Sequence, residues 1–424
     1  MTCETTSDRA GVAGLFPPSA AVVGGRLEVG GCALSDVAER FGTPTLVLDE
    51  AALRARARRY VDGLARRWPA SRVVWASKSL PVTAIYRLMG EEGLGADVAG
   101  GGELEMALAG AMDPANLVLH GNAKTDAELT RALAVGVGLI VVDNLDELDR
   151  LERLARGPQA VLLRVTPGVE AATHEAIATG HVDSKFGLSP RDLAEARRRL
   201  AGHRHLRLEG LHVHVGSQIT STAPFVAALE AIAPLGDFPV YDLGGGLGAR
   251  YTDADQPPSV EEYLDALTGA ARTLLPAGAT MLIEPGRSMV AEAACTLYRV
   301  VGVKRQATRR FVAVDGGMAD NLEVSLYGQR FAATLVDRVG GGDTYALVGR
   351  HCESGDQLID AVALDAPAPG DVLAVPVTGA YCLTMANNYN GALRPPVVFV
   401  RDGDARAVVR RETYADLLAR DVPA

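Results

Sequence analysis

Short apolar runs alternate with amphipathic stretches of helical period between about residues 44 and 287. This alternation is typical of parallel β/α units, in which each buried strand is followed by a helix that covers it. The apolar runs lie at residues 44–49, 72–78, 95–100, 116–121, 139–144, 160–165, 208–217, 240–246 and 281–286. Because eight such units close a (β/α)8 barrel, we assign the first of the nine runs to another part of the fold.

Between these runs the helical period is clear in four segments, at residues 126–135, 145–156, 189–200 and 259–275. The last two begin at Ser189 and Ser259, and serine is a favoured N-cap residue. The fold class predicted from the whole pattern is α/β, with a TIM-type (β/α)8 barrel over residues 49–287.

The pattern changes after residue 288 to shorter alternating runs broken by Gly, Pro and Asp. These runs, at residues 309–317, 344–350, 371–377 and 395–400, predict a mostly antiparallel C-terminal β domain. Residues 21–33 have the pattern of a hairpin that could pair with it. We therefore expect residues 1–48 and 288–424 to form the second domain.

The composition of the chain indicates which class of ligand it binds and in which cellular compartment it is located. A net charge of -10 provides no basic field for a phosphate backbone, so a small molecule is expected rather than a nucleic acid. No apolar run has transmembrane length, and the N-terminus has no basic leader, which predicts a cytoplasmic protein without a membrane partner. The five cysteines are far apart and lack metal-type spacing, which favours reduced thiols and no metal site.

Lys78 ends the first barrel strand, and a lysine there is usually no more than a solvated strand end. The carboxyl ends of barrel strands, however, form the face on which barrel enzymes build their sites. A partly desolvated amine there can attack a carbonyl such as the aldehyde of pyridoxal 5'-phosphate. Lys78 is therefore the candidate for covalent cofactor attachment.

A phosphate site is available after the last two barrel strands. Gly244, Gly245 and Gly246 can bring bare backbone amides to an anion, and Gly286 and Arg287 follow the neighbouring strand. The alternatives are a plain tight turn or a dinucleotide-binding loop. A dinucleotide fold is disfavoured because no suitable acidic residue ends a following strand.

Three more side chains complete the candidate chemistry. Glu284 could pair with a protonated pyridine nitrogen, although a surface pair with Arg287 is the plain alternative. Of His212 and His214, which lie on opposite strand faces, one must point into the barrel or its mouth. Cys352, in a polar segment, could return a proton to a carbanion, although a lone cysteine is more often a small buried side chain.

Together these segments resemble the fold-type III pyridoxal-phosphate decarboxylases, whose barrel is of the alanine-racemase type, and most closely the branch that converts meso-diaminopimelate to L-lysine. The resemblance runs from about residue 40 to residue 400. It is carried, in chain order, by WASKS (75–79), GADVAGGGELE (95–105), HGNAK (120–124), VDN (142–144), THEAIATGHVDSKFGLS (173–189), GLHVHVGSQI (210–219), DLGGGLG (242–248), EPGR (284–287), VDGGMADN (314–321), CESGD (352–356), GAY (379–381) and YN (389–390).

The resemblance implies a role for each matching residue. Lys78 and Cys352 would be catalytic, and a second subunit would contribute Cys352 and Glu353, so that a homodimer shares its active sites. The cofactor contacts it implies are Lys78, His214, Ser217, Gly244, Gly245, Gly246, Glu284, Gly286, Arg287 and Tyr381. The substrate contacts it implies are Arg287, Glu323, Tyr327, Glu353 and Tyr381.

One position departs from the family's pattern. Where diaminopimelate enzymes usually carry an arginine that binds the distal carboxylate, this chain has Glu323. A substrate with a different far end, such as a diamino acid of the D-lysine or D-ornithine type or a specialised-pathway amino acid, is one explanation. The other is that Arg330 or another cation substitutes. A racemase and a non-catalytic cofactor-binding homologue are the more distant alternatives.

Overall fold

The computed structural model describes residues 14–166, 168 and 184–422. Contacts divide the chain into two compact units. The barrel unit comprises Arg54–Gly248 and Pro257–Met289, and the β unit comprises Met1–Leu53, Ala249–Gln256 and Val290–Ala424. In the described part of the chain, no helix is long and apolar enough to span a membrane.

The barrel unit contains a closed barrel of eight parallel strands, and all eight runs predicted as barrel strands belong to it. Its strands close in chain order, because the last pairs with the first. They are β5 (Ser71–Ala76), β6 (Gly95–Val98), β7 (Leu117–Leu119), β8 (Leu139–Val142), β9 (Gln159–Arg164), β10 (Leu206–His212), β11 (Val240–Asp242) and β12 (Thr280–Ile283). Most of these positions are buried on both strand faces, which explains why the runs are continuously apolar.

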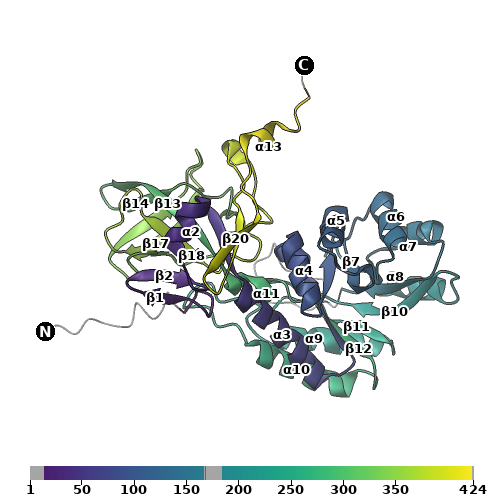
Figure 1. The fold of residues 1–424 in the computed structure, drawn as a ribbon. Helices are drawn as coiled ribbons and strands as arrows, with labels where there is room; N and C mark the ends of the chain where they lie inside the picture. The colour runs from purple at the N-terminus through teal and green to yellow at the C-terminus, as the bar shows by residue number, and fades with distance from the viewer. Residues whose placement is uncertain (1–13, 167, 169–183, 423–424) are drawn as a thin grey trace. The chain divides into compact units, whose positions relative to one another are not determined.

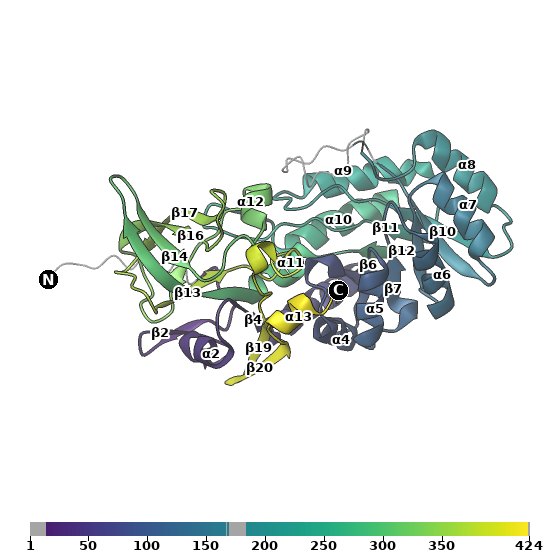
Figure 2. The same cartoon turned by 90° about the horizontal axis from the view of Figure 1, so that it is seen from above.

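Helices surround the barrel (Figure 1), and Figure 2 shows α6, α7 and α8 following one another on its outside. The helices are α3 (Glu50–Arg67), α4 (Thr83–Glu91), α5 (Gly101–Ala109), α6 (Asp126–Val135), α7 (Leu145–Leu154), α8 (Pro190–Leu200), α9 (Ala223–Ile232) and α10 (Val260–Leu274). The predicted N-caps are confirmed: Ser189 accepts a hydrogen bond from the amide of Asp192, and Ser259 forms a capping box with Glu262.

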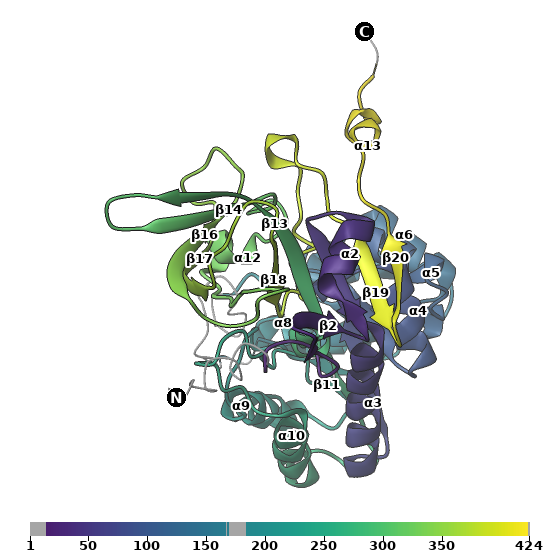
Figure 3. The same cartoon turned by 60° about the vertical axis from the view of Figure 1, so that its left-hand side comes forward.

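The β unit is built on a nine-stranded sheet. It is mostly antiparallel, as predicted, with parallel pairs at β14–β16 and β4–β19; Figure 3 shows the β19–β20 hairpin at its edge. Its strands are β4 (Thr45–Asp49), β13 (Ala294–Arg305), β14 (Arg310–Val314), β15 (Thr334–Leu335), β16 (Asp343–Val348), β17 (Gln357–Leu364), β18 (Val372–Pro376), β19 (Val397–Arg401) and β20 (Asp404–Val409). The apolar run that was left out of the barrel is β4, which is fully buried between β13 and β19.

The predicted hairpin forms its own sheet instead of extending the large one. Strands β1 (Ala21–Val23), β2 (Arg26–Val29) and β3 (Cys32–Ala33) pair with one another. Backbone hydrogen bonds from Leu27 to Val336 and from Gly403 to Gly30, together with a shared apolar core, connect this sheet to the rest of the unit. The remaining short elements are α2 (Leu34–Phe41), α11 (Arg287–Val290), α12 (Glu323–Tyr327), α13 (Tyr414–Leu418) and the 3-10 turns Ser77–Ser79, Pro114–Asn116, Ala233–Leu235, Ala291–Ala293 and Tyr389–Gly391.

One segment inside the predicted barrel range belongs to the β unit. Residues Ala249–Gln256 pack there because the fully buried Tyr251 makes an edge contact with Phe331, with ring centroids 5.1 Å apart. The hydroxyl of Tyr251 also lies 3.4 Å from Oε2 of Glu323.

Candidate active site

Lys78 lies in a tight 3-10 turn, Ser77–Ser79, directly after β5. Both flanking serines are fully buried and hold the turn. Ser77 donates to the backbone carbonyl of Asp97 at 2.6 Å, and Ser79 accepts from the indole nitrogen of Trp75 at 3.1 Å. The Lys78 side chain is 46% exposed, and its Nζ lies 4.0 Å from Oδ2 of the buried Asp97. The turn therefore presents the amine beside a carboxyl group at the carboxyl end of the barrel.

The glycine loop after β11 fits closely against the backbone of neighbouring strand ends. A Cβ on Gly245 would lie 2.0 Å from the carbonyl oxygen of Glu284, and one on Gly246 would lie 2.5 Å from that of Gly216. Gly244 and Gly246 also have φ values of +64° and +124°, which strongly favour glycine. These contacts restrict the loop to glycine, and backbone amides without side chains are the donors that the predicted phosphate site would use.

Beside this loop lie the other predicted phosphate residues of the barrel unit. Nε of Arg287, at the start of α11, donates to Oγ of Ser217 at 3.3 Å. Gly286 packs against the β5 strand end, where an added Cβ would lie 3.0 Å from that of Ala76. A guanidinium that is only 5% exposed and a hydroxyl are together a suitable donor set for a phosphate group.

His214 contacts the same loop. Its Nδ1 accepts a hydrogen bond from the amide of Gly245 at 3.2 Å, which places the ring proton on Nε2. Burial, followed by the charge of Lys78, lowers the pKa of His214 well below its usual value. The imidazole is therefore neutral and held in one orientation.

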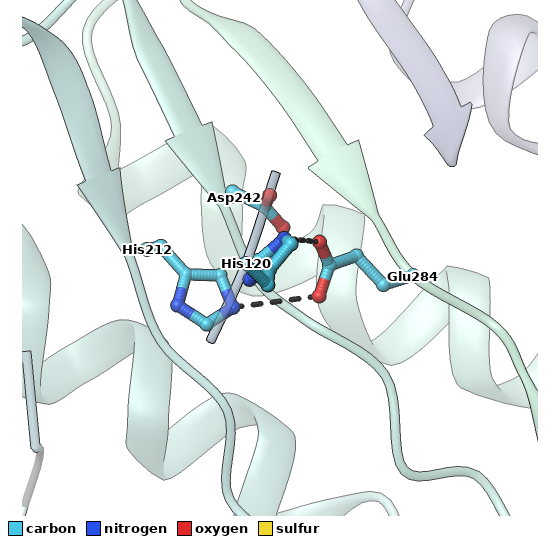
Figure 4. A group of neighbouring side chains, drawn as sticks. All are labelled: His120, His212, Asp242 and Glu284. Atoms are coloured by element: carbon cyan, nitrogen blue, oxygen red, sulfur yellow. Dashed lines mark ion pairs between the residues drawn. The ribbon is translucent and has the colours of Figure 1, made fainter. Parts of the chain in front are cut away.

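Four buried side chains from four strand ends meet inside the barrel: His120, His212, Asp242 and Glu284 (Figure 4). Nε2 of His120 lies 2.6 Å from Oε1 of Glu284, and Nε2 of His212 lies 3.4 Å from Oε2. The two imidazole rings are 4.8 Å apart in an edge arrangement. Glu284 therefore pairs with histidines rather than with Arg287 at the surface, which was the plain alternative.

Burial and neighbouring charges decide which member of this group is ionised. Burial alone would raise the pKa of Glu284, but His120 and His212 outweigh it and hold this pKa well below its usual range. Burial, followed by the charge of Glu284, raises the pKa of Asp242 well above the ordinary value. Burial lowers the pKa of His212 to about 3. Near neutral pH the group thus holds an ionised Glu284, a protonated Asp242 and a neutral His212.

The site residues predicted from the sequence do not include Asp97, His120, Arg164 or Asp242. Each lies at the carboxyl end of a barrel strand or directly after it. Arg164 is 8% exposed, with its Nε 3.8 Å from Oδ1 of Asp143. The strand-end rule that identified Lys78 could have identified all four.

In the β unit, the carboxylate of Asp356 joins two loops that carry predicted motifs. Asp356 accepts hydrogen bonds from the amides of Met318 and His351, both at 2.7 Å. This brings the 314–321 motif next to the 352–356 motif, in which Cys352 and Glu353 are both exposed. The sequence placed these motifs 30 residues apart, and the sheet brings them together.

Glu323 begins α12 and is only 1% exposed, and Tyr327 ends the same helix half-buried. Arg330, the cation considered as a substitute, is exposed three residues further on. Tyr381 adopts a φ of +63°, which is uncommon for a bulky residue and is often found at functional positions. Most of the diagnostic 173–189 motif, residues 173–183, lies outside the described residues.

Three comparisons relate this chain to known proteins. A family model described as "Pyridoxal-dependent decarboxylase, pyridoxal binding domain" matches residues 50–291. A diaminopimelate decarboxylase from Actinosynnema pretiosum subsp. auranticum is 46% identical over 96% of this chain and 95% of its own length. One from Bacillus subtilis (strain 168) is 42% identical over 94% of this chain and 96% of its own. The crystal structure of a diaminopimelate decarboxylase from M. jannaschii with L-lysine has a TM-score of 0.90 and 29% identity, covering 96% of this chain and 98% of that one.

Proposed function

This chain belongs to the pyridoxal-dependent decarboxylases, as its motifs predicted, and we propose that it converts meso-diaminopimelate to L-lysine and CO2. The observation that carries the proposal is the extent of the match. Relatives named diaminopimelate decarboxylase align with 96% and 94% of the chain at 46% and 42% identity. A match to lyases over the full length favours decarboxylation over racemisation and over a non-catalytic role.

Pyridoxal phosphate, when bound, accepts the electron pair that remains on the α-carbon as CO2 leaves. On this chain Lys78 would attach its aldehyde, and Glu284 would face its ring nitrogen. The loop Gly244–Gly246, with Ser217 and Arg287, would hold its phosphate. Two observations support this fit: close contacts with neighbouring backbone restrict the loop to glycine, and Glu284 is held as an anion at the carboxyl end of β12. His214, Gly286 and Tyr381 are the further proposed contacts.

Lys78 must lose a proton to act as a nucleophile, and Asp97 is placed to receive it. The two groups are 4.0 Å apart. Burial raises the pKa of Asp97, so this carboxyl group binds a proton more readily than an exposed one. We therefore propose Asp97 as the group that stores the proton of Lys78.

Cys352 is the proposed acid that returns a proton to the α-carbon, with Glu353 and Tyr327 as substrate contacts. We propose that a second copy of the chain supplies Cys352 and Glu353, so that the enzyme is a homodimer. Mixing Lys78→Ala protein with Cys352→Ala protein tests this. Recovery of activity in the mixture is expected, because one of the two sites of a hybrid dimer would then be intact. A dimer whose sites each use one chain would stay inactive.

A second candidate is decarboxylation of an amino acid without a distal carboxylate. The observation that favours it is the buried Glu323 at the position of the family's distal-carboxylate arginine. Losing one charge-assisted hydrogen bond costs roughly 1.5–3 kcal/mol, and a facing carboxylate adds repulsion. On this second candidate, Glu323→Arg raises turnover of meso-diaminopimelate; no gain would show that this side chain does not face the substrate.

CO2 release from a panel of amino acids decides between the two. The panel contains meso-diaminopimelate, both enantiomers of lysine and of ornithine, and arginine. Fastest release from meso-diaminopimelate supports the first proposal and removes the argument from Glu323. Fastest release from a diamino acid with a terminal amine supports the second, and no release from any compound contradicts both.

We also propose a cytoplasmic location. In the described part of the chain no cysteine is in a disulfide, which suits a reducing compartment. Cell fractionation of the producing organism would test it.

A further inference from the structure

The carboxylate of Glu284 is enclosed by three side chains that the proposed reaction does not use (Figure 4). We infer that His120, His212 and Asp242 are positioning residues: they hold Glu284 as an oriented anion, so that the ring nitrogen of the cofactor is bound in its protonated form. The inference rests on the proposed role of Glu284. It concerns how this chain sets the charge that makes the cofactor an electron sink.

The two histidines contact different oxygens of the carboxylate. His120 faces Oε1 at 2.6 Å from β7, and His212 faces Oε2 at 3.4 Å from β10. At 2.6 Å two bare lone pairs would repel each other, so this pair requires a proton on one of its two atoms. Because the two contacts hold different oxygens, they restrict rotation of the carboxylate as well as stabilising its charge.

Asp242 is the carboxyl group that is protonated and therefore uncharged. Its Oδ1 accepts from the amide of Gly244 at 3.1 Å, and its fully buried Oδ2 has no hydrogen-bond partner among the described residues. Two carboxyl groups this close in a buried site cannot both be ionised. Glu284 has the histidines, so Asp242 takes the proton, and its hydroxyl hydrogen becomes available to Glu284 as a third donor.

Other charges face the group from neighbouring strands. Oδ1 of Asp97 lies 3.9 Å from Nε2 of His120. The charge of Arg164 acts on His212, Asp242 and Glu284, and the charge of Lys78 acts on Asp97. None of these replaces a histidine at the carboxylate, so the ionisation of Glu284 depends on His120 and His212.

The same four side chains contain the donor atoms of a metal site, and the geometry argues against one. Two ligands of a tetrahedral zinc ion, bonded at about 2.0–2.1 Å, lie roughly 3.3 Å apart. His120 and Glu284 are closer than this, at 2.6 Å. The two atoms are in direct contact, which leaves no room for an ion between them.

The test compares variants that keep or remove each donor, with cofactor labelled by ¹⁵N at the ring. The variants are His120→Leu and His120→Gln, His212→Leu, Asp242→Asn, and His205→Asn as a control histidine outside the group. Two quantities are measured: the ¹⁵N chemical shift, which reports protonation of the ring nitrogen, and the dissociation constant of the cofactor. Circular dichroism checks that each variant folds.

The expected results differ between the protonated Asp242 and the histidines that stabilise the Glu284 anion. Asp242→Asn keeps the protonated shift, because an amide replaces a protonated carboxyl. His120→Leu loses protonation at neutral pH and weakens cofactor binding about ten-fold or more, whereas His120→Gln, which keeps a donor, restores much of it. The control variant matches the parent.

Two results from the labelled variants would overturn the inference while leaving the proposed function intact. One is an unchanged ¹⁵N shift in both leucine variants. The other is loss of protonation in Asp242→Asn equal to that in His120→Leu, because Asp242 would then carry the charge. Stoichiometric metal that competes with the cofactor would overturn it as well. A parent protein that binds no cofactor would instead contradict the proposed function.

Discussion

Replacing Gly245 by alanine is expected to weaken cofactor binding without unfolding the barrel. The new Cβ would lie 2.0 Å from the carbonyl oxygen of Glu284 and 2.9 Å from its carbonyl carbon, where ordinary contacts begin at 3.4 Å. Both contacts are with backbone, so no side chain can rotate away. The strand end that carries Glu284 or the loop that carries Gly245 must move by more than an ångström.

The cost of this displacement can be estimated from substitutions that overfill packed sites. Such changes typically cost about 1–3 kcal/mol. If the cost falls on the cofactor-bound form, in which both elements must be in place, the dissociation constant rises by roughly 5- to 150-fold. A titration of the protein with pyridoxal phosphate, followed by the absorbance of the bound cofactor, measures this change.

Gly269→Ala is the matched control. Gly269 lies inside α10, where an added Cβ meets nothing within 4 Å. This variant should bind the cofactor as the parent does and gain about 0.5–1 kcal/mol of stability to urea. If Gly245→Ala also binds the cofactor within two-fold of the parent, the glycine loop is not the cradle and the reasoning about the phosphate site is wrong.

Three further predictions concern buried charge and the proposed acid. Lys124→Met removes the cation that lies 2.8 Å from the fully buried Glu147, and it should lower the free energy of unfolding in urea by about 3–5 kcal/mol. The double variant Lys124→Met/Glu147→Leu should recover most of this stability, because it leaves no unpaired buried charge. An equal loss in the single and the double variant would contradict this prediction. Burial raises the pKa of Asp320 to about 7. The folded state therefore binds the Asp320 proton more tightly than the unfolded state does. The resulting contribution to the free energy of unfolding, at most about 4 kcal/mol, is full below about pH 4 and is lost as pH rises through 7. The stability of Asp320→Asn relative to the parent should therefore increase between pH 5 and pH 8. A difference in unfolding free energy that does not change with pH would refute this prediction. Cys352→Ala should slow turnover while leaving cofactor affinity unchanged, and equal kcat values for the variant and the parent would remove this thiol as the acid.

Local patterns were sufficient for much of the fold. The eight barrel strands are buried on both faces, so each left a continuous apolar run that needs no knowledge of its neighbours. Ser189 and Ser259 marked helix starts for an equally local reason, because an N-cap bonds an amide three residues away. Strand β20 gave no such signal, since it lies at the sheet edge and half of its residues are exposed. Strands β13 and β17 were also missed, and both end or pass through exposed positions.

Some residues of the candidate site could likewise be identified from local sequence, whereas others could be identified only from the tertiary structure. Lys78 and the glycine loop could be identified by residue type at a strand end, and the family motifs supplied their roles. The pairing of Glu284 with His120 and His212 could not be identified in this way, because the three side chains come from different strands and meet only when the barrel closes. Tyr251 likewise joined the β unit through distant contacts. The sequence by itself determined which residues are available for chemistry, whereas tertiary structure decided which of them are ionised, because burial and opposing charges depend on neighbours that are remote along the chain.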